Sequence, residues 1–88
     1  MKKSRKLLDK LAGILSAERQ AQQAKYASLK KVLKALRAEK TRLKEQLALA
    51  TDEESRQEIE SRLKVVSMQR KKGLGVLKDL KKERKQQN

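Results

Sequence analysis

The chain has 88 residues and carries a formal net charge of +14 at pH 7. It contains no cysteine, histidine or proline, only three glycines, and one aromatic residue, Tyr26. These absences exclude disulfides, thiolate chemistry and ordinary zinc sites, and they leave helix as the default secondary structure. We expect one small all-α domain made of amphipathic helices, without a large globular core.

One apolar stripe runs through the first half of the chain. At about 100° per residue, the apolar residues of two separated stretches fall on the same face of a single helix. The stripe consists of Leu7, Leu8, Leu11, Ile14, Leu15, Leu29, Val32, Leu33, Leu36, Leu43 and Leu47. It predicts one helix over about residues 3–50. The stripe is weak from Glu18 to Lys25, where we expect a bend, fraying or loss of contact, and Ser16 is a candidate N-cap there.

A second apolar stripe, from Ile59 to Leu80, is centred roughly 130° away from the first on the same helical clock. One straight helix would therefore face two directions, so a turn is needed between the stripes. Thr51 and Glu54 have the spacing of a capping box, and acidic residues surround them as they do at many helix starts. We predict a turn near residues 50–52 and a second helix from there to about Arg84.

The two helices predict an all-α fold: an antiparallel helical hairpin, or two-helix coiled coil. The pairing places Leu43 near Leu63. It also places Gly73 on the inward face opposite Leu33, where a small residue favours close helix packing. Gly75 faces outward in the same pairing.

Three segments follow from this arrangement. Residues 1–20 form a basic amphipathic N-terminal helical extension, residues 21–85 form the hairpin, and residues 86–88 form a frayed tail. The apolar face of the extension needs a cover, which a fold-back of the chain, a second copy or a partner protein would supply. Because so short a chain buries little surface by itself, we expect self-association into a bundle.

Charge is distributed unevenly along the chain. Residues 1–10 carry five basic and one acidic side chain, and residues 78–88 carry five basic and two acidic ones. Residues 51–60 carry one basic and five acidic side chains. A hairpin with both termini at one end would therefore have a positive end and a negative tip.

The basic end predicts a binding surface for nucleic acid, since cations that neutralise phosphates release condensed counterions. One aromatic residue and the lack of a helix-turn-helix, zinc-finger or RNP-like motif predict backbone contacts with little sequence specificity. The residues expected to make them are Lys2, Lys3, Arg5, Lys6, Lys78, Lys81, Lys82, Arg84 and Lys85.

An alternative is a coiled-coil adaptor or scaffold that binds an acidic or helical protein partner. In that case the leucine stripe docks on the partner's helices, and the charges serve solubility and steering.

Catalysis is not expected, and neither is a metal or cofactor site, because a helical hairpin offers no enclosed pocket. The stretch from Lys71 to Gly75 lacks the spacing and the strand of a phosphate-binding loop. The acidic residues near position 55 are explained by helix capping and by pairs such as Glu58–Arg62 and Glu60–Lys64.

A cytoplasmic location is expected. The N-terminal apolar run is interrupted by Asp9 and Lys10, unlike a signal peptide, and no stretch is long enough to span a membrane. Binding to a membrane surface through the N-terminal helix is disfavoured because that helix has no Trp or Phe.

Overall fold

The computed structural model describes the backbone of residues 2–86 and the side chains of residues 4–86. Four helices make up this part of the chain: α1 (Lys2–Leu15), α2 (Arg19–Ala24), α3 (Tyr26–Leu49) and α4 (Glu53–Gln86). The all-α prediction is confirmed, with no strand in residues 2–86 and with α3 and α4 as the main packed pair. Of the tail expected at 86–88, Gln86 still belongs to α4, and residues 87–88 lie outside the described residues.

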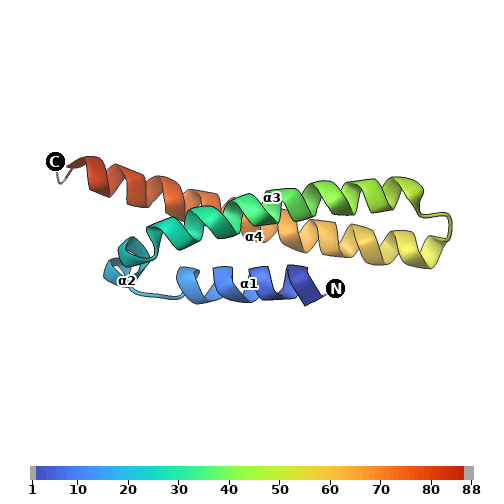
Figure 1. Ribbon diagram of the computed structural model, residues 1–88, viewed down its shortest axis with the longest axis horizontal. Helices are drawn as coiled ribbons and strands as arrows, with labels where there is room; N and C mark the ends of the chain where they lie inside the picture. The colour runs from blue at the N-terminus through green and yellow to red at the C-terminus, as the bar shows by residue number, and fades with distance from the viewer. Residues whose placement is uncertain (1, 87–88) are drawn as a thin grey trace.

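Helices α3 and α4 run antiparallel along the 53 Å length of the molecule and are joined at residues 50–52 (Figure 1). The backbone N–H of Ser55 donates to Asp52 Oδ2 at 3.0 Å, so Asp52 is the N-cap of α4. The capping box expected from Thr51 and Glu54 was therefore wrong by one residue. The same hydrogen bond is the main cause that lowers the pKa of the Asp52 carboxyl.

The single first helix expected over residues 3–50 was wrong, because the chain breaks after Leu15 within residues 16–18. Buried Gln22 stabilises the break. Its Nε2 donates to the carbonyls of Ile14 and Leu15, at 3.2 Å each, and so caps the end of α1 together with the Ala17 N–H, which also donates to the Ile14 carbonyl. Ser16 also serves the end of α1, since its Oγ donates to the Gly13 carbonyl at 3.2 Å, and it does not start α2.

Helix α1 folds back and packs against α3 and α4 (Figure 1). Its Leu11 and Ile14 are buried in the common core. Gly73 permits this close approach, because a Cβ at that position would lie 2.6 Å from Leu33 Cδ2 and 3.0 Å from Leu11 Cδ1. The predicted position of Gly73 opposite Leu33 is confirmed, as is the outward position of Gly75, which is exposed. The chain itself covers the apolar face of its N-terminal segment.

Because α1 is short, it covers only part of the α3–α4 pair. Its start is fixed where Ser4 Oγ donates to the buried carboxylate of Glu39 at 2.9 Å, and Arg42 pairs with the same carboxylate. Beyond this point α3 and α4 continue as two helices. We call residues 43–62 the tip and the other described residues, 4–42 and 63–86, the bundle body.

Candidate nucleic-acid interface

The structure separates the two groups of basic residues that the hairpin was expected to bring together. Ser4, at the start of α1, lines the same groove as Arg62 of α4. Arg62 and Arg84 are 22 residues apart on one continuous helix, which corresponds to roughly 33 Å at 1.5 Å per residue. The prediction that both basic termini share one end was therefore wrong, because α1 reverses direction after Leu15.

Within the N-terminal group, Arg5 and Lys6 are exposed on α1. The side chains of Lys2 and Lys3 lie outside the described residues. Within the C-terminal group, four lysines are exposed on α4: Lys78, Lys81, Lys82 and Lys85.

Arg84 differs from these lysines because it makes defined contacts with the rest of the bundle body. Its Nε donates to Gln23 Oε1 at 2.7 Å, and its Nη2 donates to the Gln23 carbonyl at 3.0 Å. Its guanidinium also stacks over the ring of Tyr26, 3.9 Å from the centroid. Arg84 therefore holds α4 against α2 and α3, and two of its three guanidinium nitrogens donate to the protein.

A neighbouring carboxylate is used in the same way. Glu83 accepts from Gln23 Nε2 at 3.1 Å and pairs with Arg19 of α2 at 3.2 Å. These contacts neutralise one of the few acidic groups in the bundle body.

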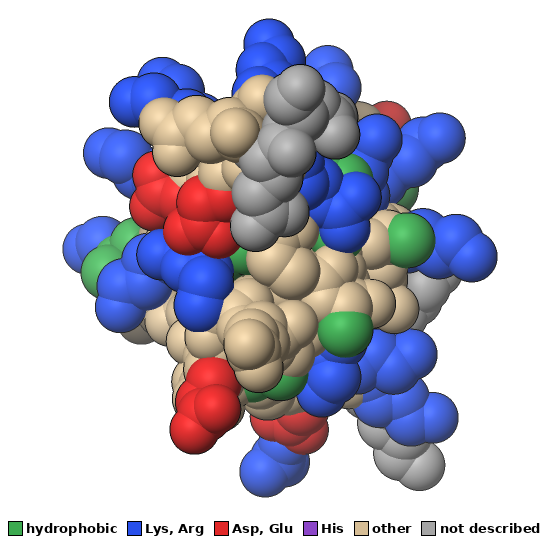
Figure 2. Space-filling view, turned by 90° about the vertical axis from the view of Figure 1, so that its left-hand side faces the viewer, with side chains coloured by type: hydrophobic (Ala, Val, Ile, Leu, Met, Phe, Trp, Pro, Cys, Tyr) green, Lys and Arg blue, Asp and Glu red, His purple; other side chains and the backbone are tan. Residues whose placement is uncertain are grey.

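Charge remains strongly polarised between the two parts of the molecule. The bundle body carries 20 basic and five acidic side chains, whereas the tip carries three basic and six acidic ones. Figure 2 looks at the end where α4 finishes, and Lys and Arg side chains surround its circumference. The predicted separation of positive and negative charge is thus present. It does not arise because the two termini meet, but because the basic residues are spread over the whole bundle body.

At the tip, Arg62 pairs with Glu58 at 2.9 Å, as expected. The expected Glu60–Lys64 pair is not among the three ion pairs closer than 4.0 Å in residues 4–86. The guanidinium of Arg56 faces inward, where it donates to the Leu47 carbonyl at 3.3 Å.

Sequence reasoning missed the basic residues of α3. Lys30, Lys34 and Arg37 are exposed, and their spacing of four and three residues places them on one helical face. That spacing was the available signal. It went unused because the clusters near the termini were denser.

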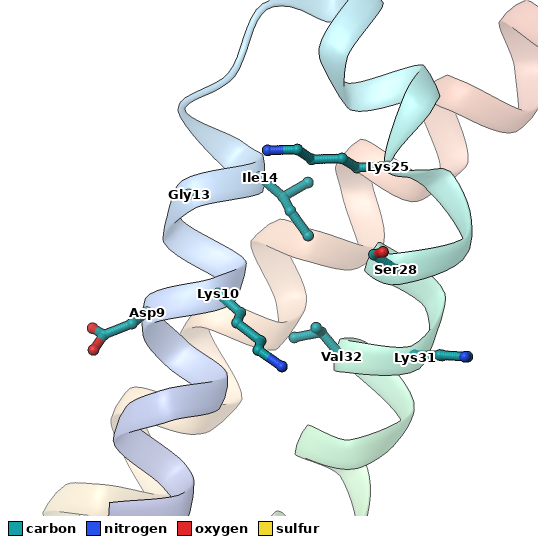
Figure 3. Close-up of a pocket in the computed structure, with 8 residues that line it drawn as sticks. All are labelled: Asp9, Lys10, Gly13, Ile14, Lys25, Ser28, Lys31 and Val32. Carbon is teal, nitrogen blue, oxygen red and sulfur yellow. The ribbon is translucent and has the colours of Figure 1, made fainter.

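A shallow groove of about 450 Å³ separates α1 from α3 (Figure 3). Lys10 and Lys25 extend into it, whereas Asp9 and Lys31 point away. Its only hydroxyl, that of Ser28, has no histidine anywhere in the chain to act as a base.

The part of the chain that the structure describes contains no group of three or more Asp or Glu side chains that could together hold a metal ion. None of its helices combines the length and apolar character that crossing a membrane requires.

Comparison of the chain with protein-family models, with curated proteins and with solved structures finds no match in any of the three. Its function has to be argued from the surface itself.

Proposed function

We propose that this protein is a non-enzymatic, basic helical protein that binds DNA or RNA through backbone phosphates, with little sequence specificity. The observation that carries the proposal is the charge of the bundle body, which has 20 basic side chains and only five acidic ones. Two of the five acidic side chains already have partners within the protein: Glu39 is buried and accepts from Ser4, and Glu83 pairs with Arg19. So dense a positive surface gains affinity for nucleic acid through counterion release.

Little sequence specificity is expected because the surface has few groups that read bases. The exposed cations are mostly lysines, which act as point charges, and the one aromatic ring lies under Arg84. Phosphate contacts fix position and orientation without carrying sequence information. The acidic tip is repelled by phosphate, so the bundle body faces the nucleic acid.

The test is a titration of labelled oligonucleotides of several sequences at several salt concentrations. If about six to eight phosphates are neutralised, log K falls against log salt with a slope of about −5 to −7, similar for all sequences. An absence of binding near 100 mM salt, or a slope near zero, contradicts the proposal.

A second candidate, an adaptor that binds a helical protein partner or a second copy of the chain, is supported by the exposed apolar residues. Leu49 is 81% exposed at the tip, and Met68 and Val65 are 57% and 48% exposed on α4. Val65 and Leu8 also line a mainly apolar groove of about 210 Å³ between α1 and α4. Exposed apolar patches of this kind often mark protein interfaces.

This candidate is tested by purification through nuclease treatment and a high-salt wash, followed by sedimentation equilibrium. An adaptor retains one defined protein, and a self-associating chain has a mass above 10.1 kDa. A monomer that retains neither contradicts it.

A further inference from the structure

One flank of the α3–α4 pair faces away from α1, and its residues can be identified from the helix phase. On α3, Val32 lines the groove with α1, whereas Leu33 packs toward Gly73 of α4. The direction from Val32 to Leu33 around the α3 axis leads away from α1. Roughly 40–100° beyond Leu33 in that direction, the α3 surface carries Arg37, Lys30 and Lys34. All three are exposed, so this side of α3 is a row of cations.

Helix α4 supplies the adjoining row. The Nε of Arg70 donates to the Leu33 carbonyl at 3.2 Å, which fixes the side of α4 that faces α3. The next roughly 20–100° of the α4 surface away from α1 carries four exposed lysines. These are Lys71, Lys78, Lys81 and Lys85.

The ring of Tyr26 shows that the two rows meet. Arg84 of α4 lies over this ring, and Lys30 Nζ lies 5.9 Å from its centroid. Together, the two rows form what we call the basic flank, made of Lys30, Lys34, Arg37, Lys71, Lys78, Lys81 and Lys85.

Among the described residues, no carboxylate lies on the basic flank. Asp9 and Glu18 belong to α1 and to the loop after it, and Glu39 is buried under the start of α1. On α4, Glu83 is turned toward Arg19, and Asp79 lies outside the flank, roughly 80° from Lys71 and roughly 100–160° from the other three lysines. The other faces of the bundle body mix both signs of charge.

The flank is long enough to follow a short piece of nucleic-acid duplex. From Lys85 to the level of Arg37 it runs for about 25 Å along α4, at 1.5 Å per residue. Its cations project from two packed helices, so the backbone positions that carry them are fixed. Seven phosphate contacts would give a salt slope of about −6, within the range that the proposed function requires.

A single strand fits the flank less well. Proteins that bind single strands without sequence preference stack the bases on exposed aromatic side chains. Here the only aromatic ring, that of Tyr26, is already covered by Arg84.

We propose that the basic flank is the surface that binds the phosphate backbone of a nucleic-acid duplex. This inference rests on the proposed function and adds the face of the molecule and the form of the ligand. Arg5 and Lys6, which the sequence also indicated, lie on α1 and contribute less, whereas Lys82 borders the flank, roughly 20° from Lys71.

The test compares two triple variants that each remove three positive charges. One neutralises the flank, with Lys34→Gln, Lys71→Gln and Lys78→Gln. The matched control neutralises exposed lysines on the side of α1, with Lys6→Gln, Lys10→Gln and Lys31→Gln. Binding to equal lengths of DNA duplex, RNA duplex and single-stranded DNA is measured across a salt series. Thermal melts check that both variants stay folded.

The flank variant is expected to lose about tenfold or more in duplex affinity near 100 mM salt, and its salt slope becomes shallower by about 2.7. The control loses less than about threefold, and the DNA and RNA arms show which duplex is preferred. Equal losses in both variants contradict the basic flank as the binding surface while the proposed function stands. Stronger binding of the single strand contradicts a duplex as the ligand. A wild-type chain that binds none of the three ligands overturns the proposed function itself.

Lysine acetylation of the wild-type chain, with and without duplex, tests the same surface without any substitution. Mass spectrometry should show Lys34, Lys71 and Lys78 protected by the duplex, and Lys6, Lys10 and Lys31 still reactive. Uniform protection of both sets contradicts the basic flank.

Discussion

The guanidinium of Arg84 stacks 3.9 Å from the centroid of the Tyr26 ring and also donates two hydrogen bonds to Gln23. This contact joins the last turns of α4 to the point where α2 meets α3, across 61 residues of sequence from Gln23. It covers one face of the only aromatic ring of the chain, which under the proposed function disfavours stacking of a base on that ring. Arg84 therefore shapes the basic end without offering its own charge freely to a ligand.

If Arg84 is structural, Arg84→Ala lowers the free energy of unfolding by about 1 kcal/mol, from the lost cation–π contact and hydrogen bonds. Lys82→Ala removes an exposed charge nearby and changes the stability by less than about 0.5 kcal/mol. Urea denaturation followed by circular dichroism measures both. Equal stability of the two variants would show that the Arg84 contacts are not formed in solution.

The two glycines of α4 should respond in opposite directions to alanine. Gly73→Ala places a Cβ 2.6 Å from Leu33 Cδ2, so packed side chains must move, and the stability falls by about 1 kcal/mol. Gly75→Ala meets no atom within 4 Å, and the better helix propensity raises the stability by up to about 1 kcal/mol. Thermal melts of the pair measure this difference. A gain of similar size in both variants would contradict the close approach of α1, α3 and α4.

Much of the fold was predictable because local patterns determine it. The phase jump between the two apolar stripes located the turn at residues 50–52, and the inward phase of Gly73 placed it opposite Leu33. The fold-back of α1 was not predictable from the helical phase of its apolar residues. Leu11 points to the core whether the helix continues or reverses, since both arrangements bury the same face. Gln22 favours the reversal, because its bonds to the carbonyls of Ile14 and Leu15 form only once the chain has turned.

The candidate site was predictable in its charge and not in its geometry. Composition alone indicated a basic binding surface, and the acidic tip followed from the counts near residue 55. The grouping of Arg5 and Lys6 with the end of α4 depended on a continuous first helix, and it failed when that helix broke. The role of Arg84 depends on Gln23 and Tyr26, which only the short helix α2 and the bend after it bring into reach.

The docking of α1 can be tested at Leu11, which is fully buried. Leu11→Ala removes packing against Leu33 and the α4 backbone near Gly73, and the stability falls by about 2–5 kcal/mol. Leu49→Ala is the matched control, because Leu49 is 81% exposed, and the stability changes by less than about 0.5 kcal/mol. Differential scanning calorimetry compares the two. A mild effect of Leu11→Ala would indicate that α1 is detached in solution.

The N-cap of α4 predicts a specific pH dependence. The hydrogen bond from the Ser55 N–H lowers the pKa of Asp52 in the folded chain below its usual value of 3.8. A depressed folded pKa means that the ionised cap stabilises the fold above the unfolded pKa, and that this stabilisation disappears as the pH falls through the folded pKa. Asp52→Asn, which removes the charge, should therefore melt at a lower temperature than the wild type at pH 6. The difference should shrink steadily as the pH is lowered below 3.8, toward complete protonation of the wild-type carboxyl.

Asp79→Asn removes an exposed carboxylate that caps no helix, and it controls for the loss of one negative charge from a chain of net charge +14. If the Asp52→Asn difference at pH 6 equals that of Asp79→Asn, or persists unchanged at pH 2, the ionised carboxylate of Asp52 does not stabilise the start of α4 in solution.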